Sequence, residues 1–138
     1  MKRPPTGLQL ALPAALLMVT VPVSAAQPAA LLDGQWGGEQ LRLMISPQGG
    51  RLVAGCADGS FEGPLALAAD GRFQVDGVFD QYAPGPQRAA EPARHTTAHF
   101  TGELRDGLMT LSILPDGASQ PQVFILRRGL AGKIIRCL

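Results

Sequence analysis

The residues with the greatest capacity for chemistry lie around one stretch of the chain. Asp80 precedes the segment "QYAPGPQRAAEPARH", Glu91 lies inside it, His95 ends it, and His99 follows four residues later. Acid–base catalysis needs two carboxylates in one cleft, so Asp80 and Glu91 are the candidate pair of a small enzyme. The β-branched run "HTTAHF" favours a strand, which would separate the two histidines by about 13 Å on one face. One metal ion cannot span that distance. We therefore predict exposed histidines, with no metal site and no cofactor.

Nucleophilic catalysis is not predicted. The sequence contains no Gly-x-Ser-x-Gly elbow, the turn on which a catalytic serine is presented. It also has no Asp-x-Asp-x-Asp-Gly run for calcium and no glycine-rich phosphate loop leading into a helix. We expect no catalytic residue.

The segment 81–95 is better suited to binding. It holds three prolines, which cannot donate to a β ladder. Loops longer than about 12–15 residues are uncommon in compact domains and are often functional. Tyr82 would be an amphipathic anchor and Arg88 and Arg94 hydrogen-bond donors, residue types enriched at protein interfaces. The alternative is a surface insertion without function.

The N-terminus has the composition of a secretory signal peptide. Lys2 and Arg3 precede an apolar run over 8–23, and small residues follow in "VSAAQP", the order in which signal peptides are built. We expect cleavage after Ala25, with Ala26 as the alternative site. An uncleaved anchor is disfavoured, because a spanning helix needs about 20 apolar residues.

The expected organisation is a signal peptide at 1–25, a short linker at 26–33 and a single β domain at 34–138. The chain has 12 Lys and Arg against 11 Asp and Glu. Two of the basic residues lie in the signal, so ten would remain and the mature net charge would be −1. Nucleic-acid binding needs a clustered basic face. We predict an exported monomer, periplasmic or extracellular, with no nucleic-acid partner and no stable membrane anchor.

The two cysteines, Cys56 and Cys137, allow one pairing, and an oxidising compartment favours a disulfide between them. A bridge that closes a loop of about 80 residues is worth roughly 4–4.5 kcal/mol in the chain-entropy model. It would also fix a terminal strand that would otherwise fray.

The strand pattern predicts an all-β fold without a convincing helix. Six of the seven aspartates precede glycine, a strong hairpin signal. Between the turns lie short apolar runs, and Gly77 interrupts one of them, which predicts a bulge. The expected strands are 41–46, 51–57, 60–67, 72–79, 96–104, 108–114, 122–128 and 133–137. We predict an eight-stranded antiparallel up-and-down meander that forms a small barrel or sandwich.

The mature chain resembles a group of small exported bacterial domains that have no assigned activity. The resemblance spans nearly the whole mature chain, and it implies export and the cysteine pairing but no function. The residues that carry it are Trp36-Gly37-Gly38, Cys56-Ala57-Asp58-Gly59, Pro64-Leu65, Gly71-Arg72-Phe73, Gly77, Thr101-Gly102, Met109-Thr110-Leu111, Gly129 and Arg136-Cys137-Leu138.

A second resemblance is to the lipocalin-like barrels. The run 34–36 has the Gly-x-Trp form that those barrels carry at their first strand, which implies that Arg127 or Arg128 covers Trp36. Gly37-Gly38 departs from the family pattern by interrupting the expected strand, and the mature chain is shorter than a lipocalin. Small periplasmic protease-inhibitor barrels have a similar start and a single disulfide. Trp36 is then either a core residue at the end of the barrel or part of a binding surface.

We expect a non-catalytic binding module, which binds a protein through 81–95 or a small apolar ligand at the barrel mouth. The alternatives are a small periplasmic enzyme that uses the loop carboxylates, a protease-inhibitor-like barrel, or a structural envelope protein. Clustering of Asp80, Glu91 and His95 would favour the enzyme. A continuous apolar cavity would favour a carrier, and a filled core with exposed Tyr82 and Arg88 would favour a protein interface.

Overall fold

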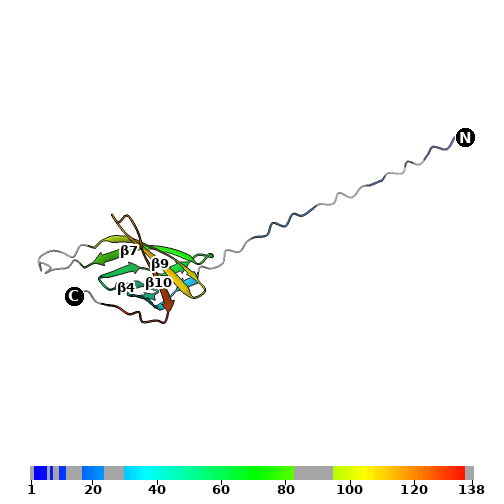
Figure 1. Ribbon diagram of the computed structural model, residues 1–138. Coiled ribbons are helices and arrows are strands. Elements are labelled where there is room, and N and C mark those ends of the chain that lie inside the picture. The colour runs from blue at the N-terminus through cyan, green and yellow to red at the C-terminus, as the bar shows by residue number, and fades with distance from the viewer. Residues whose placement is uncertain are drawn as a thin grey trace.

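The computed structural model describes residues 2–5, 7, 10–11, 17–23, 30–82 and 95–135. These residues form β-strands and no helix, and eight of the ten strands make a closed antiparallel barrel in the order β10-β2-β3-β4-β5-β7-β8-β9 (Figure 1). The strands are β1 (Ala30–Leu32), β2 (Gly34–Gly38), β3 (Leu41–Ser46), β4 (Gly49–Ala54), β5 (Ala57–Glu62), β6 (Leu65–Leu67), β7 (Arg72–Gln81), β8 (Thr97–Arg105), β9 (Leu108–Pro115) and β10 (Gln122–Arg128). The all-β prediction with eight antiparallel strands is confirmed, and the barrel is closed.

The two strands outside the barrel pair with each other. In the register of β1 with β6, Leu32 lies opposite Leu65, and both side chains belong to the buried core. Pro64 follows Gly63, whose φ is 83°, so the chain turns there and the predicted strand 60–67 is divided into β5 and β6. This small sheet adds apolar side chains to the core where the described domain begins.

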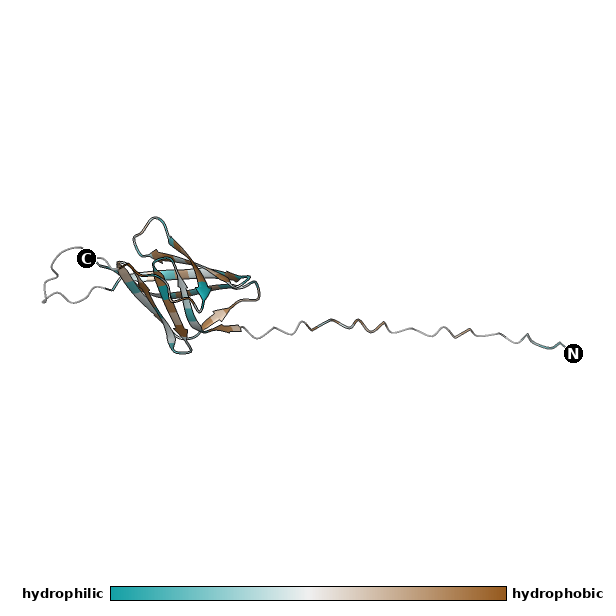
Figure 2. Cartoon of the chain, turned by 60° about the horizontal axis from the view of Figure 1, so that its bottom comes forward, coloured by the Kyte–Doolittle hydropathy of each residue, from teal (hydrophilic) through white to brown (hydrophobic). Residues whose placement is uncertain are grey.

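Hydrophobic and hydrophilic residues alternate along the barrel strands (Figure 2), as in β3, where buried and exposed residues take turns through all six positions. The interior is filled by side chains. Glycines leave room for aromatic rings there: Phe61 lies over Gly50 and Phe73 over Gly102, its partner on β8. The largest fully buried side chains are those of Trp36, Leu41, Leu43, Leu52, Leu65, Phe79, Phe100, Met109, Leu111, Ile113 and Leu126.

The first barrel strand was predicted incorrectly. It is β2, which contains Trp36, Gly37 and Gly38, whereas the sequence pattern placed these residues before the first strand. A Cβ on Gly37 would collide with the carbonyl of Leu130, and one on Gly38 with the carbonyl of Ile125. The glycines are therefore needed because other backbone segments approach β2 closely. Strand propensity does not report such an approach.

The last predicted strand is also different. Residues 129–135, which we call the C-terminal strap, form no strand, and their one bridge pairs Lys133 with Glu39 in parallel. The chain reverses at Gly129, whose φ is 79°, and the strap then runs along the outside of β2. Residues 136–137 of the predicted strand lie outside the described residues.

The Asp-Gly signal marks turns at some positions and strands at others. At Asp106-Gly107 both φ angles are positive, 51° and 77°, as the tight hairpin between β8 and β9 requires. Asp58-Gly59 lies within β5 instead, because the chain turns earlier, at 55–56. β7 passes through Gly77 in regular register without the predicted bulge. Gly77 leaves space for the carbonyl of Ser60 and the ring of Phe100.

Residues 17–23, at the end of the apolar run near the N-terminus, lie apart from the barrel (Figure 1). They are exposed. Among the residues that the structure describes, no helix is long and apolar enough to cross a membrane. The signal peptide stays a prediction.

Candidate functional site

Four polar side chains gather on one rim of the barrel, where β7 ends and β8 begins. Asp58 on β5 lies opposite Asp80 on β7 in the register of these strands. Tyr82 follows β7, and His95 lies two residues before β8. We call Asp58, Asp80, Tyr82 and His95 the rim cluster. Tyr82 and His95 flank the segment 83–94, which lies outside the described residues and contains the predicted Glu91, Arg88 and Arg94.

Asp80 connects the two ends of that segment. Its Oδ2 lies 2.7 Å from Nδ1 of His95, and its Oδ1 accepts a hydrogen bond of 2.7 Å from the backbone N–H of Thr96. The hydrogen bond with His95, followed by that from Thr96, lowers the pKa of Asp80, because both bonds favour the charged carboxylate. Asp80 therefore holds the two residues that precede β8 next to the end of β7.

Tyr82 is held at both its backbone and its phenol group. Its backbone N–H donates to the carbonyl of Cys56 at 2.8 Å. Its phenol interacts with the carboxylate of Asp58, and this interaction raises the pKa of Tyr82, since ionisation would place two negative charges together. The side chain is still 53% exposed. A large amphipathic ring, anchored through its backbone, is thus open to solvent beside Asp58.

A shallow depression of about 250 Å³ lies beside the cluster. Its lining includes the aliphatic Val53 and Val78 next to the polar groups of Arg51, Asp58 and Ser60. An Asp–His pair can hold an imidazole in one tautomer. The His95 side chain is 65% exposed, however, so water is not excluded from it. The described residues contain no group of three or more possible metal ligands.

Trp36, predicted as either a core residue or part of a binding surface, is a core residue. It is 2% exposed, and its indole Nε1 donates to the carbonyl of Asp33 at 3.1 Å. The guanidinium of Arg128 lies 5.2 Å from the ring centroid and donates to the Asp33 carbonyl and carboxylate at 3.1 and 3.0 Å. Arg128 is the arginine over the tryptophan, as the lipocalin-like resemblance implied. Trp36 therefore offers no surface to a partner.

Cys56 lies exposed in the turn between β4 and β5, and Cys137 lies outside the described residues. No described cysteine is free. The strap approaches this turn, because a Cβ built on Gly55 would lie 2.8 Å from the carbonyl oxygen of Ile135. Gly55, next to Cys56, is therefore close to Ile135, which lies two residues before Cys137. The pairing itself stays a prediction.

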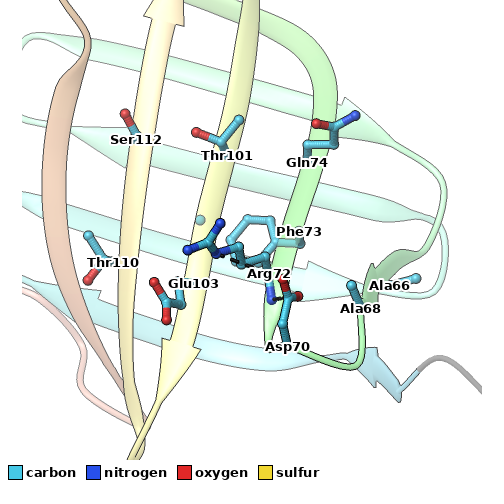
Figure 3. Close-up of a pocket in the computed structure, with 11 residues that line it drawn as sticks. Ala66, Ala68, Asp70, Arg72, Phe73, Gln74, Thr101, Glu103, Thr110 and Ser112 are labelled. Carbon is cyan, nitrogen blue, oxygen red and sulfur yellow. Dashed lines mark hydrogen bonds and ion pairs between the residues drawn. The ribbon is translucent and has the colours of Figure 1, made fainter. Parts of the chain in front are cut away.

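The outer face of β7, β8 and β9 carries a larger and more open depression of about 690 Å³. Figure 3 shows Arg72 on this face with Asp70 and Glu103 on either side, and Thr101 and Ser112 further along the strands. The hydroxyl and amide groups can form hydrogen bonds, but no acid–base pair with a nucleophile is assembled among them. In the sequence, the residues of this face are recognisable only as the polar positions that alternate with apolar positions along each strand.

The remaining histidine is placed as predicted. His99 is exposed on β8, where its Nδ1 pairs with Asp76 Oδ1 at 2.5 Å and its Nε2 lies 3.8 Å from Asp116. Both histidines are thus exposed and each faces a carboxylate.

The sequence did not single out Asp58 as a site residue, because Asp58-Gly59 was interpreted as a turn. The signal that could have placed the turn earlier is the run of small residues at 54–57, "AGCA". Comparison with known proteins gives no match to a family model, a curated protein or a solved structure. Function is therefore argued from the residues and their geometry.

Proposed function

We propose that this chain is an exported, non-catalytic β-barrel module that binds a protein partner at the rim cluster and the adjoining 83–94 segment. The observation that carries the proposal is the contrast between a filled interior and a fixed, exposed aromatic residue. Tyr82 is the exposed aromatic of the described barrel, at 53%, and tyrosine is enriched at the centres of protein interfaces.

The filled interior argues against a carrier. Ligand cavities hold about 300–1,000 Å³ of space, whereas this barrel is occupied by its own side chains, with Trp36, Phe79 and Phe100 each at 2% exposure or less. A small apolar ligand would have to displace one of these rings. A ligand on the surface does not meet that obstacle.

The rim is built to hold its groups in place before binding. Asp80 uses both carboxylate oxygens within the protein, and the backbone of Tyr82 is bonded to Cys56 while its phenol faces the carboxylate of Asp58. Binding by fixed groups loses less conformational entropy than binding by mobile ones. The neighbouring Val53 is 46% exposed and adds apolar contact area beside the polar groups.

Export and the disulfide between Cys56 and Cys137 belong to the same proposal. The approach of Ile135 to Gly55 supports the disulfide, and no described cysteine is free. The bridge would fix the strap to the rim that carries Tyr82. The position of Arg128 over Trp36 supports the resemblance to lipocalin-like and protease-inhibitor barrels, and an inhibitor is one form of such a binding module.

A small enzyme is the second candidate, because Asp80 and His95 do form the pair that catalysis would need. An assay with ester and peptide substrates separates the candidates. Asp80→Asn should abolish turnover if the pair is catalytic, whereas a binding module shows no turnover in either form.

The binding proposal is tested by a photoreactive amino acid introduced at position 82 of the exported protein. We expect one discrete protein adduct from position 82 and none from position 101, an exposed control site on β8. Equal labelling from both positions would contradict binding at the rim.

A further inference from the structure

A groove runs along the outside of the barrel between β10 and the C-terminal strap. Its volume is about 390 Å³, within the range of small-ligand sites. Gly37 and Gly38 of β2 lie against it, Ile125 and Arg127 line it from β10, and the strap contributes residues 130–133. We call it the seam groove, because β10 and β2 close the barrel here.

The groove exists because the barrel is closed by few backbone pairs at this point. β10 pairs with β2 through two residues, Arg127 and Arg128, while its register with β9 extends over six. The strap lies beside the short seam, and its carbonyls accept hydrogen bonds from β3 and from the turn between β2 and β3. Arg42 Nε donates to the Ala131 carbonyl at 2.6 Å, and the Gln40 N–H donates to the Lys133 carbonyl at 3.1 Å.

Carbonyl groups of the strap accept hydrogen bonds from the barrel, whereas several of its backbone N–H groups donate none to a described residue. The backbone N–H groups of Leu130, Ala131 and Gly132 donate to no acceptor within the described chain. These donors remain for solvent or for an acceptor group of a ligand.

The side chains around the groove combine aliphatic surface with unpaired positive charge. Ile125 is 62% exposed and Leu130 is 49% exposed. The side chains of Arg127 and Lys133 form no ion pair or hydrogen bond with any described residue. Glu39, which is also unpaired there, leaves a net charge of +1 among the groove side chains. The chemistry fits a ligand with one carboxylate next to an aliphatic group.

We propose that the seam groove binds the C-terminal end of a peptide chain whose last residue is aliphatic. The terminal carboxylate would lie between Arg127 and Lys133, and the aliphatic side chain would pack against Ile125 and Leu130. A C-terminal residue carries both groups on one Cα, which suits a groove of this size, and capture of a terminal carboxylate by charge and backbone donors is a known mode of peptide recognition. A second copy of the barrel is disfavoured, since a stable dimer buries about 1,200–2,000 Å², far more than this groove offers.

The test follows backbone amide resonances by NMR while N-acetyl-Ala-Leu is added as the free acid. We expect the largest shifts at Gly37, Gly38 and Gly132. The C-terminal amide of the same peptide should bind at least about tenfold more weakly, because it lacks the charge, which corresponds to about 1.4 kcal/mol.

Substitutions of Arg127 and Lys133 test whether these two side chains bind the terminal carboxylate. Arg127→Gln and Lys133→Gln should each weaken binding of the acid by about 3–10-fold, and the double variant should bind acid and amide alike. Arg72→Gln, on β7, which is separated from β10 by β8 and β9, should leave binding unchanged. Equal affinity for acid and amide, or an unaffected double variant, would overturn the carboxylate site. Octanoate binding as tightly as the peptide acid would overturn the peptide assignment. None of these outcomes bears on the rim cluster.

Discussion

The interior of the barrel and its rim solve different physical problems. The buried core of the described chain contains no polar or charged side chain, and its specificity comes from volumes, with rings such as Phe61 and Phe73 placed over glycines. The rim cluster is polar and half-exposed, and it is ordered by hydrogen bonds between neighbouring strands. Substitutions inside should therefore change stability, while substitutions at the rim should change binding.

The largest expected effect is in the interior. Trp36→Ala removes a fully buried ring together with its contact to Arg128, and such substitutions cost about 3–5 kcal/mol. Urea unfolding measures the loss. Tyr82→Ala is the matched control at the rim and should cost less than about 1 kcal/mol. Equal losses for the two variants would remove the distinction between the regions.

Removing the proposed disulfide should have the next largest effect. If the proposed bridge is present, Cys56→Ser and Cys137→Ser should each destabilise the domain by about 2–5 kcal/mol, and the double variant should lose little more than either single variant, because both changes would break the same bond. Thermal unfolding of the three variants measures this. Thiols that titrate freely in the non-reduced protein would contradict the pairing.

A smaller change in unfolding free energy is expected when the pH is lowered. The folded-state pKa of Asp80 is lowered, so the carboxylate adds stability that is present above its unfolded pKa of about 4 and is lost as the pH falls through the folded value. The pair is near the surface, so the contribution should stay below about 1 kcal/mol. Asp80→Asn should flatten the fall in unfolding free energy below pH 4, and an unchanged fall would contradict the bond between Asp80 and His95.

The smallest expected effect is a change in the pKa of Tyr82, which is measured by its absorbance. Tyr82 is the single tyrosine of the sequence, so its phenolate absorbance can be titrated without overlap from another tyrosine. Its pKa is raised by Asp58, and Asp58→Asn should lower it toward the ordinary value, while Glu62→Gln should leave it in place. An unchanged titration in Asp58→Asn would mean that the phenol and the carboxylate are not bonded in solution.

Alternation of apolar residues and the turn at Asp106-Gly107 made most of the barrel predictable, because both depend on neighbours in sequence. The path of β2 was not predictable in this way. Gly37 and Gly38 weaken a strand locally, and their reason for being there is the approach of Leu130 and Ile125 from the far end of the chain.

The site was predictable in its parts but not in its connections. Tyr82 and His95 were identified as exposed residues near a long loop. The contacts of Asp80 with His95 and of Tyr82 with Asp58 depend on the register of β5, β7 and β8, which sequence spacing did not determine. Because Asp58 was assigned to a turn and not to β5, its contact with Tyr82 was not predicted.

The central claim is that the rim and its 83–94 segment bind a partner while the barrel is stable without them. The most direct test replaces residues 81–94 with Asn-Gly, which joins Asp80 to His95 through a two-residue turn suited to antiparallel neighbours. Because loop-closure entropy changes slowly with length, the melting temperature should stay within a few degrees, and the adduct partner of position 82 should no longer bind. A shortened protein that unfolds, or one that still binds the same partner with unchanged affinity, would contradict the account.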